Sequence, residues 1–206
     1  MDRGADLGAP SLPPRFFGAW ERRELAIEGV AAANTGLAVW VQAGDLFVDV
    51  RGPGGLASDT CFAGTTTWDA PFLTWAHPID RHPGGDGVDR GHITFDGEDL
   101  IEEGDFIAGA SRAYRERWCR AAGVRTPLFA ATSVEGIAVR AGDHAAAVVD
   151  QRADGGGFAA EYSRVRAGEW EVVIAIADGV GAPLIAPLER DHELPDHWRD
   201  HDVADT

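Results

Sequence analysis

Short segments in which apolar and polar residues alternate recur along the chain, separated by turns that contain glycine. Four pairs of segments have this form: LAVWVQ–AGD–LFVDVR, HITF–DGED–LIEE, AVR–AGD–HAAAVVDQR and YSRVR–AGE–WEVVIAI. Alternation with a period of two is typical of β-strands, and such turns join antiparallel neighbours. The pattern therefore predicts an all-β protein with an antiparallel sandwich or barrel.

One stretch, residues 103–123, also fits the periodicity of a helix. Its residues alternate as well, because Tyr114, Glu116 and Trp118 fall on one face and Arg115 and Arg117 on the other. Aromatic residues prefer a pleated surface, so a strand is favoured over a helix here.

Several predicted strands carry an aromatic residue and a charged or amide residue on the same face. These faces are Trp40 with Gln42, Phe47 with Asp49 and Arg51, Trp20 with Arg22 and Glu24, and Tyr114 with Glu116 and Trp118. In two of these strands the opposite face is apolar, through Val39 and Val41 or Val48 and Val50. This arrangement fits a barrel wall between a packed exterior and a polar interior able to hold one small ligand, and it also fits a polar face that meets water.

Five tryptophans fall within residues 16–120, which is more than an ordinary core of that size needs. They are Trp20, Trp40, Trp68, Trp75 and Trp118. A buried indole N–H needs a hydrogen-bond acceptor, which Gln42, Asp49 or Glu116 would supply. An arginine stacked on these rings would form a cation–π lid over a planar or anionic ligand. For any one residue the simpler interpretation is a core tryptophan or an exposed Asp49–Arg51 pair on an edge strand.

The chain divides into four predicted parts. Residues 1–15 read as a flexible lead-in, 16–120 as a first β-lobe with the candidate pocket, and 121–188 as a second lobe completing or packing on the first. Residues 189–206 form a charged tail with a helical turn expected at 196–200.

Composition narrows the partners and the chemistry. The formal net charge is −16, from 34 acidic and 18 basic residues, which argues against nucleic acid and anionic membranes as partners. All basic residues are arginine, so Schiff-base chemistry and a P-loop lysine are excluded, and the chain has no GxGxxG. No cofactor is expected. The sequence has no apolar run long enough for a membrane helix and no apparent signal peptide, which predicts a cytoplasmic protein.

Histidine and cysteine give weaker signals. His77, Asp80 and His82, with His92, have spacing that a metal would accept, but the surrounding prolines and glycines predict a solvated loop, and no metal is expected. Cys61 and Cys119 lack CxxC spacing, so two free thiols are favoured over a disulfide, and neither is favoured as a nucleophile.

Three motifs in the first half resemble a known family. They are FAGTTTW (62–68), LTWAHPIDR followed by GHITFDGEDLIEEG, and YRERW (114–118), while FAAEYSRVRAGEWEV matches in outline. Their order is similar to that in a poorly characterised fungal and bacterial branch of the lipocalin-like (calycin) superfamily, with a budding-yeast member, whose members have two consecutive β-lobes. The resemblance implies a lipocalin-like fold, a small-ligand pocket and inward positions for Glu116 and Trp118. It implies no activity, because such folds include carriers and also cofactor-free decarboxylases and cyclases.

Three functions remain open at this point. In the first, the barrel binds a small hydrophobic or aromatic molecule through Trp20, Arg22, Trp40, Gln42, Trp68, Trp75 and Trp118. In the second, it is a cofactor-independent lyase, isomerase or cyclase in which Glu116 or Asp49 is the acid or base, and Arg51, Arg22 or Tyr114 steadies an oxyanion. In the third, the interior is filled and the protein serves only for interaction. The oligomeric state stays open.

Overall fold

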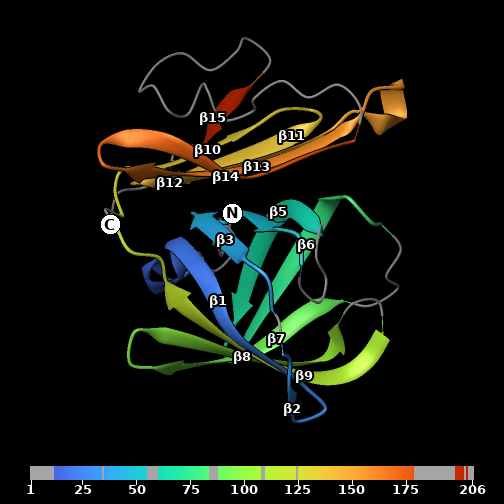
Figure 1. Cartoon of the computed structure of the whole chain (residues 1–206), viewed down its shortest axis with the longest axis vertical. Coiled ribbons are helices and arrows are strands. Elements are labelled where there is room, and N and C mark those ends of the chain that lie inside the picture. Colours follow the sequence, from blue (N-terminus) through green and yellow to red (C-terminus); the bar gives the residue numbers. More distant parts are fainter. Residues whose placement is uncertain are drawn as a thin grey trace, which may run out of the picture.

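The computed structural model describes residues 12–33, 35–54, 60–83, 88–107, 110–123, 125–178, 198–201 and 203. Within these residues the protein is built from antiparallel β-strands and two short 3-10 helices, η1 (Pro14–Phe16) and η2 (Arg152–Asp154). The predicted all-β antiparallel fold is therefore confirmed (Figure 1).

Eight of the strands close into a barrel. They are β1 (Gly18–Ile27), β3 (Ala38–Ala43), β4 (Leu46–Arg51), β5 (Cys61–Asp69), β6 (Phe72–Asp80), β7 (Asp89–Asp96), β8 (Asp99–Ile107) and β9 (Ala110–Arg120). Each strand pairs with the next in this order, and β1 pairs with β9 from Trp20↔Arg120 to Ile27↔Tyr114, which closes the ring. The short β2 (Val30–Ala31) adds to the end of β1.

A second sheet lies across the barrel wall formed by β3, β4 and β5 (Figure 1). Its strands, in spatial order, are β14 (Glu169–Asp178), β13 (Phe158–Arg166), β12 (His144–Asp150), β11 (Gly136–Ala141), β10 (Leu128–Thr132) and β15 (Arg199–His201). The helical turn expected at 196–200 is wrong in its described part, because Arg199 and Asp200 pair with β10 as a strand.

The four predicted hairpins are all present, as β3–β4, β7–β8, β11–β12 and β13–β14. The ambiguous stretch 103–123 forms the end of β8 and the whole of β9, so the choice of strand over helix is confirmed.

At Gly64 in β5, the backbones of β5 and β6 approach each other closely. A Cβ there would come within 1.8 Å of the carbonyl oxygen of Ala76, beside a bulge in the β5–β6 pairing.

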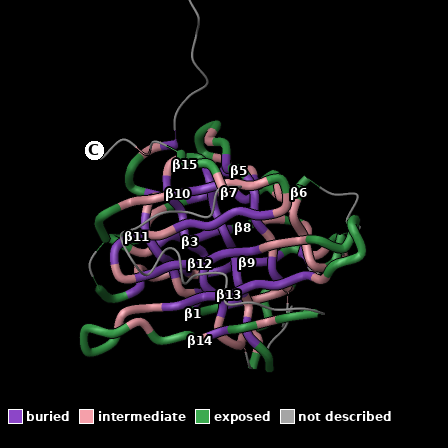
Figure 2. The backbone as a smooth tube through the Cα atoms, turned by 90° about the horizontal axis from the view of Figure 1, so that it is seen from above, coloured by how far each residue is buried: buried purple, intermediate pink, exposed green. Residues whose placement is uncertain are grey.

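The main apolar core lies between the barrel and the second sheet. Val39, Val41, Val48 and Val50 on the barrel's outer face are fully buried there. The sheet contributes, among others, Val139, Val148, Phe158 and Tyr162. Figure 2 shows the resulting burial where the second sheet overlies the barrel. The packed exterior predicted for these strands is therefore the interface with the second sheet, and the opposite face points into the barrel.

The face predicted to carry Trp20, Arg22 and Glu24 is wrong for Glu24, because β1 has a bulge after Arg22. Trp20 and Arg22 in β1 point inward as expected, but the register shifts between Arg22 and Glu24. Leu25 therefore turns inward and is 2% exposed, whereas the Glu24 side chain is 61% exposed. An extra residue in one strand reverses the alternation beyond it.

Three further observations concern the termini, the cysteines and membranes. Leu12, in the stretch expected to be a flexible lead-in, is buried against the barrel. Cys61 and Cys119 are both free, as favoured from their spacing, with Cys61 buried and Cys119 half-buried. Among the described residues, none forms a helix of the length and apolarity that crossing a membrane requires.

Candidate functional site

One end of the barrel interior is aromatic. We call it the aromatic end; it comprises Leu12, Phe16, Trp20, Trp40, Phe47, Trp68, Leu73, Trp75, Ile93, Phe95, Leu100 and Trp118. Trp40 stacks on Trp20 at 6.0 Å between ring centroids and meets the edges of Trp75 and Trp118 at 5.8 and 6.2 Å. Phe16 of η1 contacts Trp68 and so covers the end of the barrel. The protein's own side chains therefore fill this end.

Two of the indole N–H groups at the aromatic end, those of Trp20 and Trp40, donate to acceptors within this end or its cover. Trp40 donates to the side-chain oxygen of Gln42 at 2.9 Å, and Thr66 donates to the same oxygen at 2.8 Å. Trp20 donates to the backbone carbonyl of Phe16 at 2.8 Å. The expectation that Gln42 would accept from an indole is confirmed. Asp49 and Glu116, the other expected acceptors, bind arginines instead.

The other end of the barrel interior is polar. We call it the polar end; it comprises Arg22, Asp49, Arg51, His77, Asp80, Asp89, Glu102, Tyr114 and Glu116. Arg22 donates to Glu116 across the β1–β9 seam at 2.7 Å, with both side chains at most 3% exposed. Arg51 donates to both carboxylate oxygens of Asp49, at 2.9 and 3.2 Å. Asp49 and Arg51 thus form a pair inside the barrel, and not an exposed pair on an edge strand.

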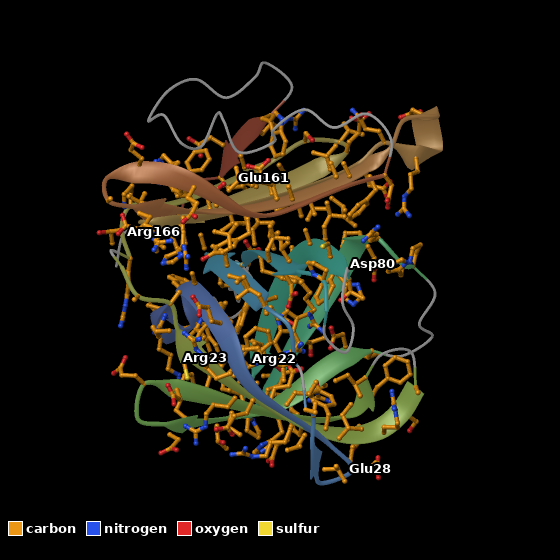
Figure 3. The ribbon with its side chains drawn as sticks, in the orientation of Figure 1. Arg22, Arg23, Glu28, Asp80, Glu161 and Arg166 are labelled. Carbon is orange, nitrogen blue, oxygen red and sulfur yellow. The ribbon has the colours of Figure 1, made fainter. Side chains whose placement is uncertain are left out.

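Arg22 carries an unused donor. Its Nη1 binds Glu116 and its Nη2 donates to the carbonyl of Thr35 at 2.8 Å, but its buried Nε has no hydrogen-bond partner in the described structure. The residue is 4% exposed and lies within the barrel, whereas the adjacent Arg23 has an exposed side chain (Figure 3). A buried polar group without a partner is costly, so this N–H requires an acceptor from water or from a bound molecule.

Glu102 has the most strongly raised pKa that is resolved among the carboxyl groups of the polar end. It is buried and accepts from Tyr114 Oη at 2.6 Å and from Trp118 Nε1 at 3.0 Å. Two glycines make room for this arrangement. A Cβ on Gly91 would lie 2.7 Å from Glu102 Cγ, and one on Gly104 would lie 2.5 Å from the Tyr114 ring. Larger residues at these two positions would displace the carboxylate or the phenol.

Burial and negative neighbours shift the acidity of this group. Desolvation, together with the charges of Glu116 and Asp89, raises the pKa of Glu102 to about 8. Desolvation likewise raises the pKa of Asp89 to about 6, against the opposing effect of His77. The pKa of Tyr114 is raised as well, chiefly by burial and then by Glu102. Glu102 therefore keeps a proton at neutral pH, whereas Asp89 keeps one only in slightly acidic solution.

Three residues of the polar end are reached by solvent although they lie on inward-facing positions. The side chains of His77, Asp80 and Asp89 are 28%, 18% and 31% exposed. His77 Nδ1 lies 3.1 Å from Asp80 and Nε2 lies 3.6 Å from Asp89. The hydrogen bond with Asp80 raises the pKa of His77. The loop predicted for His77 and Asp80 is wrong, because both belong to strand β6.

No metal centre is found here. Among the described residues, no group of three or more histidine, cysteine or acidic side chains is placed to hold a metal ion. His82 lies beyond the end of β6, and His92 contacts Phe72 at 5.6 Å.

The residues that the sequence proposed for a site divide between the two ends. At the polar end lie Asp49, Arg51, Arg22, Tyr114 and Glu116, and at the aromatic end lie Trp20, Trp40, Gln42, Trp68, Trp75 and Trp118. Sequence reasoning missed Glu102, Asp89 and the two glycines. Alternation within LIEEG does place Leu100 and Glu102 on one face, so a signal existed for Glu102.

Comparisons with protein-family models, with curated proteins and with solved structures gave no match to this chain.

Proposed function

We propose that this protein binds one small organic molecule at the polar end of its barrel, in the manner of a lipocalin-like carrier. The supporting observation is the buried Nε of Arg22, which lies among inward-facing charged groups and has no hydrogen-bond partner among the described residues. Eight-stranded barrels have room for side chains or for one small ligand. The solvent-reached side chains of His77, Asp80 and Asp89 suggest where a molecule would enter.

The ligand expected from the structure differs from one held by tryptophans on all sides. Trp20, Trp40 and Trp118 are at most 2% exposed and are already packed against one another or hydrogen-bonded. Trp75 pairs across strands with Asp89 and, at 7%, is more exposed than these three tryptophans. A ligand with a single apolar or aromatic face and a polar group fits this arrangement better than a wholly hydrophobic one. A cytoplasmic location and the absence of nucleic-acid and membrane partners stay predictions of the sequence.

The proposal is tested by native mass spectrometry of the protein purified from its host lysate. We expect a small molecule that is retained in the native spectrum and lost on denaturation. His77→Trp should reduce its occupancy, because the larger ring would obstruct the solvent-reached side of the polar end. His92→Trp is the matched control, since His92 lies on the outer face of β7 against Phe72. The absence of any retained molecule, or equal loss in both variants, would refute the proposal.

A second candidate is a cofactor-independent lyase, isomerase or cyclase acting on the same molecule. The observation that favours it is the pKa of Glu102, about 8, which suits a general acid or base at neutral pH. The arrangement moves this role from Glu116 and Asp49, which are held by Arg22 and Arg51, to Glu102. Incubating the retained molecule with fresh protein tests this candidate. A product formed by wild-type protein but not by Glu102→Gln would support an enzyme, and unchanged ligand would support a carrier.

A further inference from the structure

The polar end contains more acidic than basic groups. Its carboxylates are Asp49, Asp80, Asp89, Glu102 and Glu116, and its basic groups are Arg22, Arg51 and His77. Among the described residues, five carboxylates thus face two arginines and one histidine, so two negative charges remain uncompensated even when His77 is protonated.

The deficit of positive charge is localised at two residues. Glu116 and Asp49 each have an arginine partner. Within the part of the chain that the structure describes, Glu102 receives hydrogen bonds from the neutral donors Tyr114 and Trp118 only. The carboxylate of Asp89 lies 3.6 Å from Nε2 of His77, but the same imidazole also interacts with Asp80 through Nδ1 at 3.1 Å. Glu102 and Asp89 lie on the neighbouring strands β8 and β7. The side chain of Glu102 lies against Gly91, two residues from Asp89, and the charge of Asp89 acts on Glu102.

The acidity of the two groups agrees with this localisation. Both pKa values are raised, and the charged groups that affect Glu102 most are Glu116, Asp89 and Arg51. A buried carboxyl group with too little positive charge around it keeps a proton. A cation that arrived between these carboxylates would replace that proton.

Two features next to the carboxylates favour an organic cation. The first is Trp75, which pairs directly with Asp89, so an indole ring lies beside one of the two carboxylates. Aromatic faces attract ammonium groups, most strongly where water is excluded. The unpartnered Nε of Arg22, which lies beside Glu116, independently calls for an acceptor atom on the bound molecule.

We propose that the ligand of the polar end is a small protonated amine with a neighbouring oxygen atom. Its ammonium group lies between Glu102 and Asp89, and its oxygen accepts from Nε of Arg22. This inference rests on the proposed function and assigns a charge to the bound molecule. Binding transfers the proton of Glu102 to solvent, because the ammonium takes over the compensation of the carboxylate.

The test uses three probes that share a phenyl ring and a hydroxyl group and differ in charge: 2-amino-1-phenylethanol, 1-phenyl-1,2-ethanediol and mandelate. Isothermal titration at pH 7 in phosphate and in MOPS, two buffers that lack a primary amine, gives affinity and proton release. We expect the amine to bind about ten-fold or more tightly than the diol, with mandelate weakest. We also expect release of about one proton for each amine bound.

The variants Glu102→Gln and Glu103→Gln complete the design. They make the same change on adjacent residues of β8, one inside the barrel and one with a side chain 53% exposed. Glu102→Gln should abolish both the preference for the amine and the proton release, and Glu103→Gln should change neither.

Three outcomes overturn the inference: mandelate or the diol binding as tightly as the amine, a preference for the amine that survives Glu102→Gln, or no binding by the amine at millimolar concentration. Native mass spectrometry then separates the two proposals. A retained neutral or anionic molecule refutes the amine and leaves the proposed function standing, whereas no retained molecule refutes both.

Discussion

Replacing Glu102 by glutamine should change how stability depends on pH. In the folded protein this carboxyl group is 6% exposed and its pKa is raised by burial from 4.5 to about 8. The folded state therefore keeps a proton that the unfolded chain gives up between these two values. Stability from this group is fully present below about pH 4.5 and is lost as the pH rises toward 8.

The size of the effect follows from the same pKa values. One pKa unit corresponds to about 1.4 kcal/mol, so the rise from 4.5 to about 8 is equivalent to at most about 5 kcal/mol. Glutamine does not titrate, but its amide loses one of the hydrogen bonds made with Tyr114 and Trp118, at about 1 kcal/mol. Glu102→Gln should therefore be about 1 kcal/mol less stable than wild type at pH 4.5 and several kcal/mol more stable at pH 9.

Urea denaturation followed by tryptophan fluorescence at pH 4.5, 7 and 9 measures this crossover. The control is Glu103→Gln, whose stability should follow that of wild type at every pH, because the Glu103 side chain is 53% exposed on the outside of β8. Asp89 and His77 titrate in both proteins, so the difference between the wild-type and Glu102→Gln curves reports Glu102 together with its effect on the neighbouring Asp89. Parallel curves for wild type and Glu102→Gln would refute the assignment of the raised pKa to this residue.

Three other substitutions or reactions probe the remaining parts of the structure. Glu116→Gln should cost about 3–5 kcal/mol of unfolding free energy, because it leaves the buried Arg22 without its carboxylate. Phe158→Ala should cost about 3–5 kcal/mol, since the ring is 1% exposed in the core between barrel and second sheet. In thiol labelling of the folded protein, Cys119 should react before Cys61, because Cys61 is buried and burial raises its pKa to about 12.

Each of these expectations has a result that contradicts it. Restored stability in the double variant Arg22→Met/Glu116→Leu is expected, and an additive loss would show that the two residues are not a pair. Val134→Ala, at a fully exposed position, should change stability by less than about 0.5 kcal/mol, and a cost like that of Phe158→Ala would mean that truncation is harmful anywhere. Intact mass that rises by two on reduction would contradict the free thiols.

The strands, their hairpins and most of their faces were determined by the sequence. Glycine-containing turns set the ends of each hairpin, and alternation set which side chains share a face, as in Trp40 and Gln42 opposite Val39 and Val41. Both signals are local, because they arise from the backbone conformation of a few consecutive residues. The inward positions of Trp118, Glu116 and Tyr114 followed from alternation in the same way.

Tertiary structure alone decided which polar groups meet. Arg22 and Glu116 are 94 positions apart and become neighbours only when β1 pairs with β9. The bulge after Arg22, which turned Glu24 outward, depends on that same closure and left no local mark in the sequence. Glu102 became a group of raised pKa because barrel closure removes water and brings other carboxylates close. Acidity depends on the surroundings in three dimensions, and a strand's pattern specifies only the direction in which its side chain points.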